Sequence, residues 1–127
     1  MRYLGLIVKT VCIVTLLLFT VTFAYAGSIV LSWDPPTTNE DGTPLPITGI
    51  TGYKIYCGTS SKNYATPITV TGGAITTFTL TNKPAGTYYC AATAFKTIGT
   101  TVLESKYSNE VSKVVLEVPP SPPTNCR

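Results

Sequence analysis

Residues 87–95 read TYYCAATAF, an uninterrupted run of β-branched, aromatic and small residues that is typical of a strand. Alternation along such a strand places residues 88, 90, 92 and 94 on one face and 89, 91, 93 and 95 on the other. The shorter run YKIYC at residues 53–57 alternates in the same way. Because Lys54 cannot face a hydrophobic core, Tyr53, Ile55 and Cys57 are expected to point inward.

Four further runs of this kind follow one another along the chain, each bounded by Gly, Pro, Asn or Asp. They predict strands at residues 29–33, 67–71, 75–80 and 111–118. No stretch shows the apolar period of a helix. Six short strands predict an all-β, two-sheet sandwich. Trp33, the only tryptophan of the chain, is expected at the centre of its core.

The first 26 residues have the layout of a secretory signal peptide. Arg2 and Lys9 form a basic start, residues 11–23 are uncharged and apolar, and the sequence Ala-Tyr-Ala precedes Gly27. This pattern predicts cleavage between Ala26 and Gly27 and a secreted or periplasmic protein. The alternative is an uncleaved membrane anchor, although a spanning helix needs about 20 apolar residues and Lys9 interrupts the run.

The composition excludes several kinds of function. Without histidine the chain has neither Ser–His or Cys–His catalysis nor a histidine metal ligand. Charged residues make up only 12% and the net charge is +3, too little for a nucleic-acid-binding surface. Residues 39–42 (NEDG) resemble part of a calcium loop but lack its later ligands, so a polar turn is expected there. We therefore expect no enzyme activity, no cofactor and no metal.

Five motifs, taken in order, resemble a fibronectin type III domain of the kind found in secreted bacterial proteins. They are WDPP (33–36), GYKIY (52–56), GTSS (58–61), GTYY (86–89) leading into AATA (91–94), and YSNEV (107–111). The resemblance implies an immunoglobulin-like sandwich at residues 27–116, followed by a proline-rich tail at 117–127. It also implies that Trp33 is the core tryptophan and Tyr88 the tyrosine-corner residue. The function expected from this resemblance is non-catalytic binding of a protein or a carbohydrate.

The expected start of the mature chain departs from that family. Only residues 27–32 separate the cleavage site from Trp33, so the strand that opens a complete domain, strand A, is expected to be missing. The edge of the strand at residues 29–32 is then either solvated or covered by a partner strand or by the chain's own tail. A structural subunit of a surface assembly, associating through this edge or through Cys126, is therefore the alternative function.

Two cysteines in the core strands are a second departure. If Tyr53 lies opposite Ala94 in the antiparallel pair that the family implies, paired residue numbers add up to 147. Cys57 and Cys90 fit the same sum. This register predicts a core disulfide, provided that the pair is of the narrow, non-hydrogen-bonded type. Two buried thiols that pack as small apolar groups are the alternative.

Cys126 remains without a partner in the tail. Four prolines within residues 119–123 predict an exposed polyproline II segment there. The exposed thiol of Cys126 is expected either to form an intermolecular disulfide, as in a homodimer, or to carry a small-molecule cap.

Two regions are candidates for ligand binding. Tyr56, Tyr89 and Phe95 are expected on the outer face of the sheet, where they form either an aromatic binding patch or ordinary cross-strand packing. The loops expected at residues 34–52 and 97–105 should lie at the same end of the sandwich, where such scaffolds commonly carry function.

Overall fold

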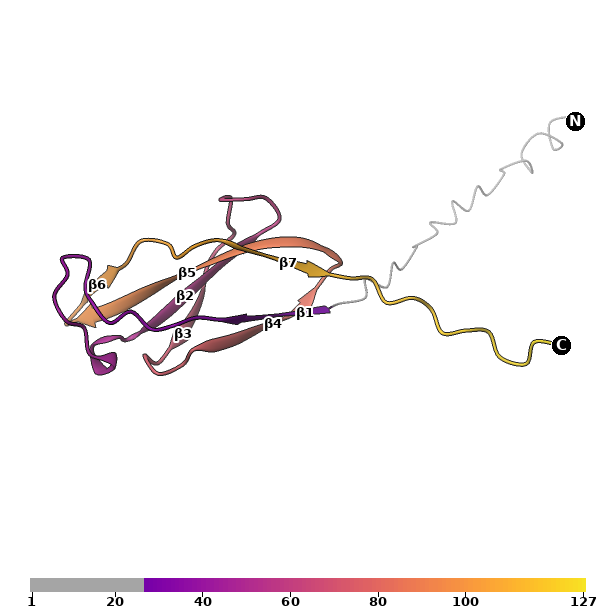
Figure 1. Ribbon diagram of the computed structural model, residues 1–127, viewed down its shortest axis with the longest axis horizontal. Helices are drawn as coiled ribbons and strands as arrows, with labels where there is room; N and C mark the ends of the chain where they lie inside the picture. Colours follow the sequence, from indigo (N-terminus) through magenta and orange to yellow (C-terminus); the bar gives the residue numbers. More distant parts are fainter. Residues whose placement is uncertain (1–26) are drawn as a thin grey trace, which may run out of the picture.

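The computed structural model describes residues 27–127, so the expected signal peptide, including Ala26, lies outside the described residues. The described chain is all-β, with seven strands in two antiparallel sheets, which confirms the predicted class and layering (Figure 1). One short 3₁₀ turn, η1 at Ile47–Gly49, lies between the first two strands. The strands are β1 Gly27–Ser32, β2 Gly52–Gly58, β3 Ile68–Thr71, β4 Thr77–Lys83, β5 Gly86–Ile98, β6 Thr101–Glu104 and β7 Val111–Val115.

The smaller sheet consists of β1 and β4. Ile29 lies opposite Leu80 and Leu31 opposite Phe78. Because alternate side chains of a strand point to opposite faces, Ile29 and Leu31 are buried whereas Val30 is exposed. Within residues 27–127 no strand pairs with the other edge of β1. The open edge that the sequence predicts is therefore present among the described residues.

The larger sheet is organised around β5, a strand of 13 residues. β2 and then β3 lie on one side of β5, and both β6 and β7 pair with its other side. The pairing of β2 with β5 has the predicted register, with Tyr53 opposite Ala94 and Cys57 opposite Cys90. β6 pairs with the C-terminal part of β5 and β7 with its N-terminal part, so two short strands share one edge.

A short irregular segment between β6 and β7 stays on the same edge of β5. The backbone N–H groups of Ser105 and Ser108 donate to the carbonyl oxygens of Ala94 and Ala92, respectively. The two serine hydroxyls accept hydrogen bonds from the N–H groups of the same two alanines. Side-chain oxygens thus replace backbone carbonyls here, and both N–H groups of β5 remain bonded.

The core lies between the two sheets and draws side chains from both. Its cluster contains Ile29, Leu31, Ile55, Val70, Leu80, Tyr88, Cys90 and Val115. The most completely buried side chains are Tyr53, Ile55 and Cys90. Of the expected core positions on β2 and β5, Tyr53, Ile55, Tyr88 and Cys90 are buried, whereas Cys57, Ala92 and Ala94 are half-buried. On the opposite face of β5, where exposed residues were expected, Ala91 and Thr93 are buried as well, so the alternation predicts the buried face only in part.

Trp33 lies at the margin of the core instead of its centre. It follows the last residue of β1, is half-buried, and packs against the cluster with its ring centroid 5.1 Å from that of Tyr53. Its indole nitrogen is buried without a hydrogen-bond partner among the described residues. Trp33 is the first residue after β1, and its backbone N–H still donates to the carbonyl oxygen of Thr76.

Cys57 and Cys90 form the predicted disulfide across β2 and β5. Their Cα atoms are 4.2 Å apart, close to the spacing of a non-hydrogen-bonded antiparallel pair. The bond joins residues 33 positions apart, and the segment that it closes contains β3 and β4. The segment between the two cysteines therefore includes β4, a strand of the smaller sheet, although the disulfide itself joins two strands of the larger sheet.

The prediction of an open loop at residues 97–105 was wrong. β5 continues to Ile98 and the chain returns as β6, with Ile98 opposite Thr101 around a two-residue turn. Gly99 in this turn has φ 61°, a left-handed conformation that glycine adopts without strain. β-Branched residues on both sides of this glycine are the signal that was missed. The last strand is also shorter than predicted and ends at Val115.

Removal of the disulfide should destabilise the folded protein by about 3.5–4 kcal/mol, because the unfolded chain regains the entropy of the closed loop. Guanidinium denaturation of the double variant Cys57→Ala, Cys90→Ala, followed by tryptophan fluorescence, measures this loss. Cys126→Ser is the control, since Cys126 is free and exposed. An unfolding free energy that stays at the wild-type value in the double variant would contradict the expectation.

Tyr88 lies at the turn from β4 into β5, and its hydroxyl donates a hydrogen bond of 2.9 Å to the carbonyl oxygen of Pro84. Tyr88→Phe should lower the free energy of unfolding by about 0.5–1.5 kcal/mol, because one hydrogen bond is lost with little change in packing. Tyr89→Phe, on the opposite face of β5, is the matched control. Equal losses in the two variants would show that the bond to Pro84 has no specific role.

Candidate functional site

The β1–β2 loop and the end of β5 with β6 lie at the same end of the sandwich (Figure 1). A pocket lies between them. This loop-end pocket has a volume of roughly 510 Å³. The Lys96 ammonium donates to the side-chain oxygen of Asn39 over 2.9 Å, and the backbone N–H of Lys106 donates to Glu40 over 2.8 Å. These two contacts confirm that the two chain segments meet at the same end, as the sequence predicts.

The apolar part of the lining comes from both segments. Leu45 and Ile50 belong to the β1–β2 loop, whereas Phe95 and Leu103 belong to β5 and β6. Leu103 is 46% exposed, although it is a large apolar residue. An exposed leucine beside a pocket provides contact area for a ligand.

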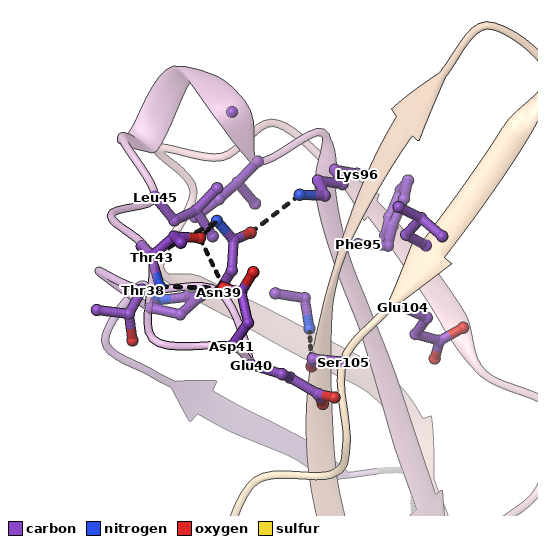
Figure 2. Close-up of a pocket in the computed structure, with 15 residues that line it drawn as sticks. Thr38, Asn39, Glu40, Asp41, Thr43, Leu45, Phe95, Lys96, Glu104 and Ser105 are labelled. Atoms are coloured by element: carbon purple, nitrogen blue, oxygen red, sulfur yellow. Dashed lines mark hydrogen bonds between the residues drawn. The ribbon is translucent and has the colours of Figure 1, made fainter.

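Three of the polar residues that line the pocket are acidic, Glu40, Asp41 and Glu104, and the side chain of Glu104 points away from the other two (Figure 2). Asp41 accepts hydrogen bonds from the hydroxyl and the backbone N–H of Thr43, at 2.6 and 3.0 Å. These bonds lower the pKa of the Asp41 carboxyl group below its ordinary value. Asn39 also donates to the Thr43 hydroxyl. Residues 39–42 therefore form the polar turn that was expected.

Among the charged residues that line the loop-end pocket, the acidic ones outnumber the basic one. The lining contains three carboxylates but only one lysine. This arrangement suits a ligand that presents several hydroxyl, amino or guanidinium donors next to an apolar surface. Within residues 27–127 no three Asp, Glu or Cys side chains are grouped so that they could hold a metal ion.

Three tyrosines pack together on the outer face of the larger sheet and form a second candidate surface. In this tyrosine cluster the ring of Tyr107 lies 4.9 Å from that of Tyr56 and 5.4 Å from that of Tyr64, between centroids. Both contacts are edge-to-face, a geometry that the ring quadrupoles favour. Tyr107 is 55% exposed, so part of the cluster is open to solvent.

Glu104 connects the tyrosine cluster to the sheet below it. It accepts hydrogen bonds from the Tyr56 hydroxyl, the Lys54 ammonium and the Thr93 hydroxyl. Burial would raise the pKa of Glu104, but these three hydrogen bonds outweigh it and lower the pKa. Burial, together with the hydrogen bond to this carboxylate, raises the pKa of Tyr56 to about 12.

Glu110 holds the other side of the tyrosine cluster. It accepts hydrogen bonds from the hydroxyls of Ser61 and Tyr64 and from the backbone N–H of Lys62. These hydrogen bonds lower the pKa of Glu110. In turn, the hydrogen bond to Glu110 and partial burial raise the pKa of Tyr64 to about 12. The β2–β3 loop is thereby fastened to the segment that precedes β7.

The three aromatic residues expected on the outer face do not form one patch. Tyr56 joins the tyrosine cluster, whereas Phe95 lines the loop-end pocket and Tyr89 lies opposite Gly58 at the end of β2. Tyr64 and Tyr107 were not predicted as site residues. Both lie outside the regular strands, where alternation gives no information about the face on which a side chain lies.

The tail contains the remaining candidate, Cys126, which is a free and exposed cysteine. Its expected role in an intermolecular disulfide stays a prediction. In the part of the chain that the structure describes, no helix has the length and apolar character needed to cross a membrane. Comparison with known proteins gives no matching family model, no matching curated protein and no matching solved structure.

Tyr64 should ionise near pH 12 instead of near its ordinary pKa of 10.0. Since the folded pKa is the higher one, the hydrogen bond to Glu110 stabilises the fold fully below pH 10.0, and this contribution is lost as the pH rises through 12. Glu110→Gln should move the pKa of Tyr64 toward its ordinary value, as measured by NMR of ring-labelled tyrosine.

Glu117→Gln serves as the control for this titration, because Glu117 lies in the exposed tail. It removes the same charge and should leave the titration of Tyr64 unchanged. A wild-type Tyr64 that titrates together with the tyrosines free of carboxylate partners would contradict the role of Glu110.

Proposed function

We propose that the chain is a fibronectin type III-like module of a secreted bacterial protein, which binds a protein or a carbohydrate and catalyses no reaction. The two-sheet sandwich supports this assignment, with β1 and β4 in one layer and β3, β2, β5, β6 and β7 in the other. The hydrogen bond from the Tyr88 hydroxyl to Pro84 also supports it, because a tyrosine corner of this type occurs in immunoglobulin-like sandwiches.

The disulfide supports an extracytoplasmic location. A bond between Cys57 and Cys90 indicates an oxidising compartment, because cytosolic thiols are kept reduced. Export through the signal-like sequence at residues 1–26 is part of the proposal and fits this compartment.

The loop-end pocket is the observation that carries the binding function. The carboxylates of Glu40 and Asp41 and the apolar side chains of Leu45 and Leu103 belong to residues that line this pocket, so it offers both acceptors and an apolar surface. A sugar ring presents hydroxyl donors around an apolar face and matches this arrangement. A peptide segment with lysine or arginine is the protein ligand that matches the acidic lining.

The hydrogen bonding and the ionisation of the acidic side chains in the pocket agree with binding without catalysis. Each of the three carboxylates that line the pocket accepts hydrogen bonds from neighbouring residues: Glu40 from Lys106, Asp41 from Thr43, and Glu104 from Lys54, Tyr56 and Thr93. The lowered pKa values of Asp41 and Glu104 keep these two groups ionised at neutral pH. Neither is therefore suited to donate a proton as a general acid.

Leu103→Ser should weaken ligand binding about tenfold, because an apolar wall of the loop-end pocket is lost. Val102→Ser is the matched control: Val102 is the neighbouring residue on β6, is similarly exposed, and does not line the pocket. A glycan array and an array of lysine- and arginine-containing peptides identify the ligand, and titration calorimetry with the strongest hit compares the variants.

Two outcomes of this experiment would contradict the proposal. One is that neither array gives a ligand for the wild-type protein. The other is that the two serine variants bind the ligand equally well, since binding would then not involve the loop-end pocket.

A further inference from the structure

The free edge of β1 carries main-chain groups without partners. Leu31 pairs with Phe78 on β4, and in the same register the Trp33 N–H donates to the carbonyl oxygen of Thr76. In an antiparallel ladder, alternate residues direct their N–H and C=O groups to opposite sides. Val30 and Ser32 therefore direct theirs away from β4, toward an edge that no strand of residues 27–127 covers.

A cleft of roughly 340 Å³ lies directly beside this edge. Its apolar lining includes Leu31 from β1, Ile55 from β2, Cys90 from β5 and Val111 from β7. Ile55 and Cys90 are only 2% and 1% exposed, so the cleft reaches the centre of the core. We refer to this space, which shares no lining residue with the loop-end pocket, as the β1 cleft.

From Ile29 to Ser32, β1 has no feature that normally prevents pairing at a free edge. Natural edge strands are usually protected by a charged side chain, a proline or a bulge. The sequence of β1, GSIVLS, contains neither a charged residue nor a proline, and its one irregularity lies at its start, between Gly27 and Ile29. From Ile29 to Ser32 the strand is regular and open.

We propose that the edge of β1 and the β1 cleft accept one extended strand of another protein, in addition to the function of the loop-end pocket. The main chain of this strand pairs with Val30 and Ser32. Its apolar side chains, at every second position, enter the cleft. Asp34 is the only charged residue that lines the cleft, so a basic residue at that end of the strand completes the match.

The tail of the chain is a poor occupant of this edge. Pro119, Pro120, Pro122 and Pro123 have no backbone N–H group, so residues 119–123 cannot form a continuous ladder with β1. The tail also contains no lysine, and its one arginine is the last residue of the chain. A separate partner with alternating apolar residues fits the free groups of β1 better.

A synthetic peptide of alternating valine and threonine, with lysine at its N-terminal end, is the probe. Antiparallel pairing with β1 would place this lysine beside Asp34. The full-length chain is expressed with ¹⁵N labelling, and the purified protein is titrated with the peptide. We expect chemical-shift changes and slowed amide exchange at Val30 and Ser32, without corresponding changes in the loop-end pocket.

Val30→Pro removes the N–H group on the free edge and leaves the ladder to β4 unchanged, because Val30 does not donate to β4. It should weaken binding of the peptide about tenfold, as expected for the loss of a main-chain hydrogen bond and a clash at the edge. Val30→Thr is the matched control, since it keeps the N–H group and should bind like the wild type. A peptide N-methylated at the position that faces Val30 lacks the reciprocal hydrogen bond, from the peptide N–H to the Val30 carbonyl oxygen, and tests the pairing with the unaltered protein.

Three results would overturn the proposal. The first is equal affinity of the wild type for the plain and the N-methylated peptide. The second is slow amide exchange at Val30 and Ser32 in the free monomer, which would show that the tail already covers the edge. The third is self-association that Val30→Pro abolishes, without peptide binding by the wild type. The occupant would then be a second copy of the chain.

Discussion

The antiparallel register of β2 against β5 is the constraint on which the rest of the structure depends. In this register Cys57 lies opposite Cys90, Tyr53 and Ile55 are buried, and Tyr56 lies on the outer face. A shift of one residue would exchange the two faces of a strand and separate the cysteines. The disulfide therefore does more than close a loop, because it fixes which side chains of the larger sheet belong to the core and which to the surface.

The other edge of β5 has a change of register that creates both candidate surfaces. Paired residue numbers add up to 199 along β6 and to 201 along β7, so two extra residues are accommodated between these strands. Ser105 and Ser108 keep this segment bonded to β5, and Tyr107 between them packs against the tyrosines of the outer face. Glu104 comes just before the segment, where it lines the loop-end pocket and also binds the Tyr56 hydroxyl.

This difference between the two edges of β5 explains how much the sequence could predict. The edge shared with β2 is regular, so alternation and the position of Lys54 predicted the inward residues of β2, and the strand pairing implied by the family resemblance then predicted the disulfide. The edge shared with β6 and β7 is irregular, and side-chain hydroxyls replace carbonyls there, which no period of two can describe. The contacts of Tyr107 were missed for this reason. Tyr64 lies in the β2–β3 loop, where alternation gives no information either, and the regular hairpin at Gly99 was missed because its β-branched residues were interpreted as a loop. Trp33, the first residue after β1, was predicted too centrally.

The two layers of the sandwich differ in how completely they are stabilised. The larger sheet is joined by the disulfide and by ladders on both sides of β5. The smaller sheet has only β1 and β4, and a two-stranded sheet is marginal unless its apolar face packs on another layer. Ile29, Leu31 and Leu80 provide that packing, but they do nothing for the main-chain groups of Val30 and Ser32 at the free edge. An added strand would therefore extend the less complete layer, while the loop-end pocket and the tyrosine cluster, on the other layer, keep their geometry.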